Sequence, residues 1–290
     1  MPEIQGTEHI FTTSDGLGKF KLLSNKVLFE QYYHEQATDF SFHTIAWNRG
    51  QKQIVTIDEV QYHFDEHAVL PIMLNQSFSF ENPQDIVAWQ FNREFYCIAN
   101  HDAEVGCVGF IFFGPSPTMF VSLNEEQQKK MQSLFDLFEE EFNSEEDIKG
   151  EMLRMLLVRL IINITRLAKK QYLGTEEVVE EKFNLIRQFN LLVEIHFRKE
   201  HQIAFYSNLL NKSPKTISNY FSLYSNKTPL QIIQDRIIAE AKRLFYYSDK
   251  SVKEIADELG FEDAAHFSKF FKKCTSHSPT ELKKAVFKSK

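Results

Sequence analysis

Cysteine is scarce in this sequence, and its few copies have no recognisable spacing. Cys97, Cys107 and Cys274 form neither a paired disulfide framework nor a metal-ligand motif. An odd number of cysteines without a framework is typical of a reducing compartment, so we expect a cytoplasmic protein. Nothing in the sequence predicts a cofactor.

Long hydrophobic runs are also absent. The N-terminus lacks the basic segment and the apolar segment that together make a secretory signal. The longest apolar stretch, residues 152–164, is interrupted by Arg154, Arg159 and Asn163. Such a stretch does not suit a bilayer core, so no membrane association is predicted.

Motifs for catalysis are missing or poorly placed. The sequence has no glycine-rich phosphate loop, no nucleophile elbow and no pair of catalytic acids. Residues 63–67, HFDEH, match the string of one class of zinc protease, which needs both histidines on one helix. Their neighbours read as strand and turn, and His43 stands alone on its own predicted strand. We therefore predict that the chain is not an enzyme.

The net charge of −7 is divided unevenly along the chain. Residues 1–175 hold 14 Lys and Arg against 25 Asp and Glu, whereas residues 201–290 hold 15 against 9. A basic surplus confined to one end favours contact of that end with phosphate, and leaves the acidic half for other contacts.

The first 120 residues favour β-structure. Short runs rich in aromatic and β-branched residues alternate with turn residues, which predicts a small barrel or a sandwich. The expected strands are residues 41–47, 53–57, 59–64, 68–74, 86–91, 95–99 and 107–113.

The periodicity changes to helical after residue 124. A first helix carries one apolar face, and a second is expected over residues 145–171. The second helix has apolar residues at alternating steps of four and three, which predicts a coiled-coil seam between subunits. These dimerisation candidates are Leu153, Leu157, Leu160, Ile164 and Leu167. A second apolar face on the same helix leaves open that the helix covers the β-domain instead.

The last third of the chain repeats itself at an offset of 50 residues. Ile217 corresponds to Phe267, Phe221 to Phe271, and the pair 228–229 to the pair 278–279. Each copy predicts a helix, a tight turn and a second helix. The expected helices are residues 177–199, 204–210, 214–224, 229–247, 252–259, 263–274 and 279–288. Two helix-turn-helix units at fixed spacing suit double-stranded DNA.

The second helix of each copy presents small and polar side chains opposite its apolar face. Such groups near a helix N-terminus suit base edges in a major groove. The predicted base-reading residues are Lys215, Ser218, Asn219, Ala264, Ala265, His266, Ser268 and Lys269, and the predicted phosphate contacts are Ser213, Lys272 and Lys273. The 19-residue helix between the copies would be roughly 28 Å long, close to the roughly 34 Å between successive major grooves.

Residues 236–284 closely resemble the signature of the AraC/XylS family of transcription regulators. The matching segments are residues 239–242, 252–256, 259–261, 266–273 and 278–279. The resemblance covers about residues 180–288 and implies a seven-helix module that reads adjacent major grooves, with RNA polymerase as a partner. Two positions depart from the family pattern, because Asn226 and Ser276 stand where glycine is usual. Lys283 and Lys284 replace arginines, which weakens a bidentate phosphate clamp there.

The N-terminal half resembles the cupin-type sensor domain of many such regulators, on strand number, strand order and Gly50. We therefore expect an α+β chain with three parts: a cupin-like β-barrel sensor over residues 1–120, a helical linker or dimerisation region over 121–174, and a double helix-turn-helix domain over 175–290. The barrel is expected to bind a small-molecule effector. The candidate pocket residues are Trp47, Tyr62, Trp89 and Phe91.

These features predict a sequence-specific regulator of transcription, with a homodimer as the expected assembly. Two alternatives stay open. One is a metal-dependent cupin enzyme fused to a helical domain, and the other is a regulator whose N-terminal half serves only protein–protein association.

Overall fold

A computed structural model describes residues 6–25, 30–31, 42–74, 76–98, 110–113, 118–173, 177–224 and 227–283. The chain divides into two compact units. Unit 1 contains the strands and two long helices up to residue 176, and unit 2 contains the helices from residue 177 onward. Within the described residues, no helix combines the length and apolar character needed to cross a membrane.

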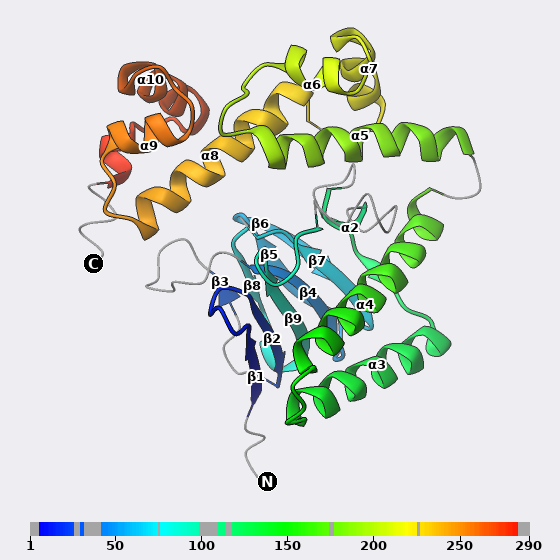
Figure 1. The fold of residues 1–290 in the computed structure, drawn as a ribbon. Helices are drawn as coiled ribbons and strands as arrows, with labels where there is room; N and C mark the ends of the chain where they lie inside the picture. The colour runs from blue at the N-terminus through cyan, green and yellow to red at the C-terminus, as the bar shows by residue number, and fades with distance from the viewer. Residues whose placement is uncertain are drawn as a thin grey trace. The chain divides into compact units, whose positions relative to one another are not determined.

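Unit 1 is built on two antiparallel sheets (Figure 1). The first has the strand order β1-β2-β9-β4-β7-β10, and the second has the order β3-β8-β5-β6. The strands are β1 (Thr7–Thr12), β2 (Lys19–Ser24), β3 (Glu30–Gln31), β4 (Phe42–Asn48), β5 (Gln53–Ile57), β6 (Val60–Phe64), β7 (Ala68–Ile72), β8 (Phe78–Phe80), β9 (Ile86–Asn92) and β10 (Val121–Ser122).

The centre of the six-stranded sheet is buried on both faces. Every residue of its central strands, β4 and β9, is buried. Side chains alternate between the two faces of a strand. Ala46 and Ala88 face each other in the register and belong to an apolar cluster with Val55 and Phe64 of the four-stranded sheet. Trp89, on the opposite face of β9, packs against Phe138 of a helix described next.

The helices of unit 1 cover that opposite face. α3 (Glu125–Asn143) and α4 (Lys149–Tyr172) lie side by side next to the strands (Figure 1). α3 begins with a capping box in which Asn124 and Gln127 exchange hydrogen bonds, and its predicted apolar face is buried. The buried residues are Met131, Leu134, Phe135, Phe138 and Phe142.

The position of α4 corrects the predicted coiled-coil seam. Leu153, Leu157, Leu160 and Ile164 are all 0% exposed in the single chain, and Leu167 is half-buried. A seam between subunits must be exposed in each separate subunit, so these four side chains are core residues of unit 1. The apolar stripe therefore packs inside unit 1. This agrees with the alternative left open from the sequence, in which the helix covers the β-domain of its own chain.

The β-structure differs from the expected barrel. The described strands form two separate sheets that are not joined into one closed barrel, and a cupin identity does not follow from them. Two expected strands were wrong. Residues 93–95 form a turn, and α2 (Phe110–Phe113) is a short helix inside the expected strand 107–113, of which residues 107–109 lie outside the described part. Aromatic residues there have high β-propensity, but they serve as packing groups on a turn and a helix.

Unit 2 is helical in its described residues. Its helices are α5 (Glu177–His196), α6 (Ile203–Leu209), α7 (Pro214–Tyr224), α8 (Pro229–Tyr247), α9 (Val252–Glu258) and α10 (Ala264–Thr275). Residues 279–283 are also helical. The α6–α7 pair lies at one end of α8 and the α9–α10 pair at the other (Figure 1). One apolar cluster joins all six helices, so both pairs share a continuous core.

Candidate nucleic-acid interface

The 50-residue repeat corresponds to two copies of one packing arrangement. Ile217 and Phe267 are each 0% exposed, and Phe221 and Phe271 are each 1% exposed. In the first copy Phe221 packs edge-on against Phe189, with ring centroids 5.1 Å apart. In the second, the rings of Phe267 and Phe271 pack against each other and against α8. The same positions therefore anchor α7 and α10 in the core, as the repeat predicts.

Four helical segments of unit 2, which follow Ser213, Thr228, Ser251 and Ser278, begin in the same way. A Ser or Thr side chain caps the helix N-terminus and receives a hydrogen bond from the backbone N–H three residues later. Thr228 with Gln231 and Ser251 with Glu254 form complete capping boxes. Ser278 and Glu281 exchange the same pair of hydrogen bonds. The matching caps at 228 and 278 confirm that the copies are alike in local structure.

The predicted reading faces are exposed to solvent. On α7, Lys215, Ser218 and Asn219 are all exposed. Ile217 and Phe221 of the same helix are buried. α7 therefore presents two polar groups and one cation that are free of the core.

The reading face of α10 is more mixed. Ala265, His266 and Lys269 are exposed, whereas Ala264 and Ser268 are half-buried. The Ser268 hydroxyl donates a 2.6 Å hydrogen bond to the Ala264 carbonyl, which leaves it only as an acceptor for another partner. The His266 ring packs edge-on against Phe261 at 5.5 Å. The eight predicted residues thus lie on the two second helices, and six of them, including Asn219 and Lys269, are exposed.

The predicted phosphate contacts lie near the ends of the same helices. Ser213 is exposed and caps α7, where its Oγ accepts a 3.0 Å hydrogen bond from the Thr216 N–H. Lys272 and Lys273 are exposed in the last turn of α10. Lys283 donates to the Lys250 carbonyl at 2.6 Å, so it is held by the protein backbone. Lys284 lies outside the described residues.

Ser276 adopts the backbone conformation that the family pattern fills with glycine. Its φ is 66° and ψ is −6°, the left-handed region, and it ends α10. A side chain in this region costs roughly 1–2 kcal/mol. The strain expected from the sequence at this turn is therefore present. The other departure, Asn226, lies outside the described residues.

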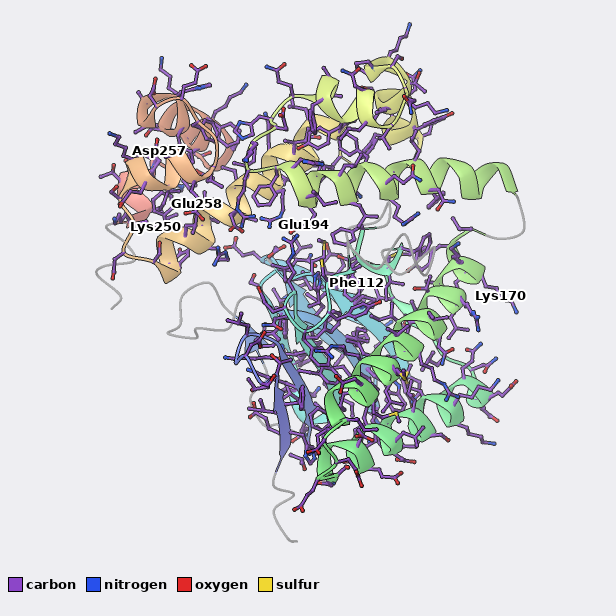
Figure 2. All side chains as sticks on the ribbon, viewed as in Figure 1. Phe112, Lys170, Glu194, Lys250, Asp257 and Glu258 are labelled. Carbon is purple, nitrogen blue, oxygen red and sulfur yellow. The ribbon has the colours of Figure 1, made fainter. Side chains whose placement is uncertain are left out.

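A buried ion network that sequence reasoning missed joins α5 to α8. Arg236 on α8 donates bidentately to Glu194 on α5, at 2.5 and 3.0 Å. Glu240, one turn further along α8, accepts from Arg236 at 3.2 Å, from Arg243 at 2.7 Å and from Arg198 at 2.6 Å. Glu194 extends from α5 in Figure 2. Only the spacing of 236 and 240 on one helix face hinted at a pair, because the other partners are far away in sequence.

The network holds Glu240 in its charged form. Its side chain is 2% exposed. Burial alone would raise its pKa, but the hydrogen bond from Arg243 and the charges of Arg236, Arg243 and Arg198 lower the pKa from 4.5 to about 2. Burial alone would lower the pKa of Arg236, but the charges of Glu194 and Glu240 and the hydrogen bonds to them together raise it. Breaking one partner of such a network typically costs a few kcal/mol, so the α5–α8 contact is a stiff part of unit 2.

The candidate effector-pocket residues in unit 1 do not share one surface. Trp47 and Trp89 are 3% and 0% exposed and lie on the face of the sheet that α3 covers. Phe91 is on the same face of β9, stacked with His43. Tyr62 packs with the cluster between the sheets instead. The predicted four-residue pocket is therefore wrong, because the alternation along β4 and β9 turns three of its members away from the fourth.

A polar pair lies between the two sheets. The Gln90 amide donates a 3.0 Å hydrogen bond to the Thr44 hydroxyl, and both side chains are buried. They share this face with Ala46 and Ala88, which belong to the apolar cluster between the sheets. Sequence reasoning missed the pair because alternation did not show which face is internal to the two sheets.

The histidines considered for metal chemistry are not gathered. His63 is exposed on β6, and His67 pairs with Glu66 in the turn that follows, so the 63–67 string is strand and turn as expected. His43 is 4% exposed and lies among aromatic rings. The described residues contain no group of three or more potential metal-binding side chains.

Comparisons with known proteins agree with the site in unit 2. Residues 206–285 match the family described as a helix-turn-helix domain. The transcriptional activator RhaS from Enterobacter sp. (strain 638) is 27% identical over 107 residues, covering 37% of this chain and 38% of RhaS. The arabinose operon regulatory protein from Escherichia coli K12 is 25% identical over 149 residues, covering 51% and 50%. The chain thus spans half or less of the length of these two relatives.

A solved structure of ToxT from Vibrio cholerae aligns with 98% of this chain and 96% of its own, at 13% identity and a TM-score of 0.43. That similarity is too weak to identify the fold of unit 1. Three observations indicate the same architecture for unit 2, a pair of helix-turn-helix motifs. They are the sequence signature, the repeated packing of α6–α7 and α9–α10, and the similarity to the two regulators. Unit 2 therefore contains a helix-turn-helix domain, and its sequence is similar to those of these two transcription regulators.

Proposed function

We propose that this chain is a transcription regulator that binds a specific DNA sequence through α7 and α10, and that it is not an enzyme. The observation that carries the proposal is the pair of repeated helix-turn-helix units, each anchored by buried residues and each presenting an exposed polar face. Their connection by a single 19-residue helix suits neighbouring turns of one duplex. The match of unit 2 to the helix-turn-helix family supports the same ligand.

Asn219 and Lys269 are proposed as the principal base contacts. An exposed Asn on a recognition helix suits the two hydrogen-bonding groups of adenine, and an exposed Lys suits the acceptors of guanine. Ser213, Lys272 and Lys273 are proposed to hold phosphates, because they lie at the ends of the same helices. The basic surplus after residue 201 supports such contacts.

The test begins with the duplexes that the full chain selects from a random-sequence pool. The double variant Asn219→Ala plus Lys269→Ala should lose about 1–3 kcal/mol of discrimination at each contacted base pair. Lys272→Ala, which removes one of the exposed cations proposed to hold phosphate, should weaken binding to all sequences alike. A double variant that keeps the wild-type sequence preference would refute these reading faces, and an affinity insensitive to salt would refute phosphate contact.

The effector is proposed to bind in unit 1, between the two sheets. Gln90 and Thr44 provide a buried hydrogen-bonding pair there, beside two alanines. A small molecule needs such a polar anchor within an apolar surround. RNA polymerase contact, homodimer formation and a cytoplasmic setting stay predictions from the sequence.

Native mass spectrometry of the purified full chain separates the open alternatives. A co-purified small molecule that is lost in Gln90→Leu supports the effector proposal. A stoichiometric transition metal would favour the cupin enzyme, with His43, His63 and His67 as the first residues to replace. A bound protein with neither would favour protein association as the role of unit 1.

A further inference from the structure

The segment that joins α5 to α6, residues 197–202 (the α5–α6 junction), contacts the linking helix α8. The Arg198 guanidinium donates a 2.6 Å hydrogen bond to Glu240, in the middle of α8. Phe197 is 0% exposed, and the Arg236 guanidinium lies 3.8 Å from the centre of its ring. The junction is therefore held on α8 by an ion pair and by a buried cation–π contact.

The same junction contacts the turn between α9 and α10. Gly260, which begins that turn, has a φ of +74°. A Cβ at this position would lie 2.3 Å from the Arg198 carbonyl oxygen and 3.2 Å from the Lys199 Cα. Only glycine allows this approach of two backbones. The neighbouring rings of His201 and Phe261 are 4.7 Å apart, which extends the contact.

Arg198 thus lies at the crossing of three elements. Its side chain reaches α8, which links the two helix-turn-helix pairs. Its carbonyl faces the turn of the second pair, α9–α10. The junction itself leads directly into α6, the first helix of the α6–α7 pair. If only α8 joined them, the α6–α7 and α9–α10 pairs could twist relative to each other as that helix flexes. The second contact, through the α5–α6 junction, removes this freedom.

We propose that Arg198, Glu240 and Gly260 form a clasp that fixes the separation and angle of α7 and α10. The clasp makes DNA recognition depend strictly on the spacing of the two half-sites. One inserted base pair moves the second half-site by roughly 3.4 Å and rotates it by about 35° around the duplex axis. The proposal rests on the function proposed above, and it concerns positioning residues, which need not touch the DNA.

The experiment uses the full chain and a duplex selected from a random-sequence pool. Its affinity is compared for the selected duplex and for duplexes with one, two or three base pairs inserted between the half-sites. Arg198→Ala is the test variant. Lys199→Ala is its matched control, because it removes an exposed cation from the next position and leaves the clasp intact.

Wild type and Lys199→Ala should lose at least about tenfold in affinity on the first insertion. Arg198→Ala should lose less than about threefold in affinity on the same insertion. Without the clasp, its two helix-turn-helix pairs can move to follow the displaced half-site. Equal spacing dependence in wild type and Arg198→Ala would overturn the clasp. A wild-type chain that selects no sequence from the pool would overturn the proposed function itself, so the two failures are distinguishable.

Gly260→Ala tests the backbone contact through stability. Gly16 has nearly the same backbone angle, φ +75°, but no atom lies within 4 Å of a Cβ built there. Gly16→Ala therefore measures the conformational strain alone. Gly260→Ala should lower the unfolding temperature of unit 2 clearly more than Gly16→Ala lowers that of unit 1. Equal losses would contradict the close approach of Gly260 to the junction.

Discussion

The buried carboxylate of Glu240 gives the sharpest quantitative prediction. Glu240→Gln keeps the size of the side chain and removes its charge, while Arg236 keeps its bidentate contact with Glu194. The fall of the Glu240 pKa from 4.5 to about 2 measures how strongly the folded state favours the charged form. At 1.36 kcal/mol per pKa unit, this coupling corresponds to about 3 kcal/mol. In a domain of this size that loss lowers the unfolding temperature by roughly 12 °C.

The same coupling fixes the pH dependence. A carboxyl group whose folded pKa is depressed stabilises the fold above its unfolded pKa of 4.5, and this contribution is lost as the pH falls towards 2. The stability gap between wild type and Glu240→Gln should therefore be about 3 kcal/mol at neutral pH and roughly 1.5 kcal/mol near pH 3.

The assay can separate the two units without cutting the chain. Both tryptophans, Trp47 and Trp89, lie in unit 1, so their fluorescence reports unit 1 alone. Far-ultraviolet circular dichroism reports mainly the helices, many of which belong to unit 2. Glu240→Gln should shift the circular dichroism transition and leave the fluorescence transition in place. Glu262→Gln, at an exposed position, should shift neither by more than about 0.5 kcal/mol. If the stability difference between wild type and Glu240→Gln stayed constant with pH, it could not come from the charge of the Glu240 carboxylate.

Two further predictions concern unit 2. Ser276→Gly should stabilise it by about 1 kcal/mol in circular dichroism melts, because glycine relieves the left-handed backbone at φ 66°; no gain would show that the turn is unstrained. Burial lowers the pKa of His201 despite hydrogen bonding to Leu259 and Phe197 and the charge of Glu200. Since the fold disfavours the protonated ring, the stability of unit 2 should fall as the pH drops below 6.5, and His201→Gln should flatten this dependence. An equal slope in both proteins would contradict it.

The helical unit could be predicted well from the sequence because its signals are local. The bounds of α7 and α8 match the expected helices, since Pro214 and Pro229 follow caps and fix the first turns. The repeat identified the buried anchors of both copies. The proposed clasp could not be predicted, because Arg198 meets Glu240 and Gly260 only through the tertiary fold.

Unit 1 was predicted less accurately, for physical reasons that particular residues show. The stripe from Leu153 to Ile164 has the period of a subunit seam, but α4 is buried in its own domain, and periodicity alone does not tell which surface covers a helix. Strands β1 and β2 were missed because they are short and mix many polar residues with few apolar ones. Phe110 and its neighbours favoured a strand by propensity, whereas tertiary packing makes them a helical turn.

Protection of guanine N7 atoms from methylation tests most directly whether α7 and α10 read neighbouring major grooves. On a selected duplex with guanines in both half-sites, the full chain should protect two clusters of guanine N7 atoms, about one helical turn apart. Lys269→Ala should remove protection from one cluster and leave the other. A single protected cluster, or two clusters that weaken together in this variant, would contradict separate reading by the two helices.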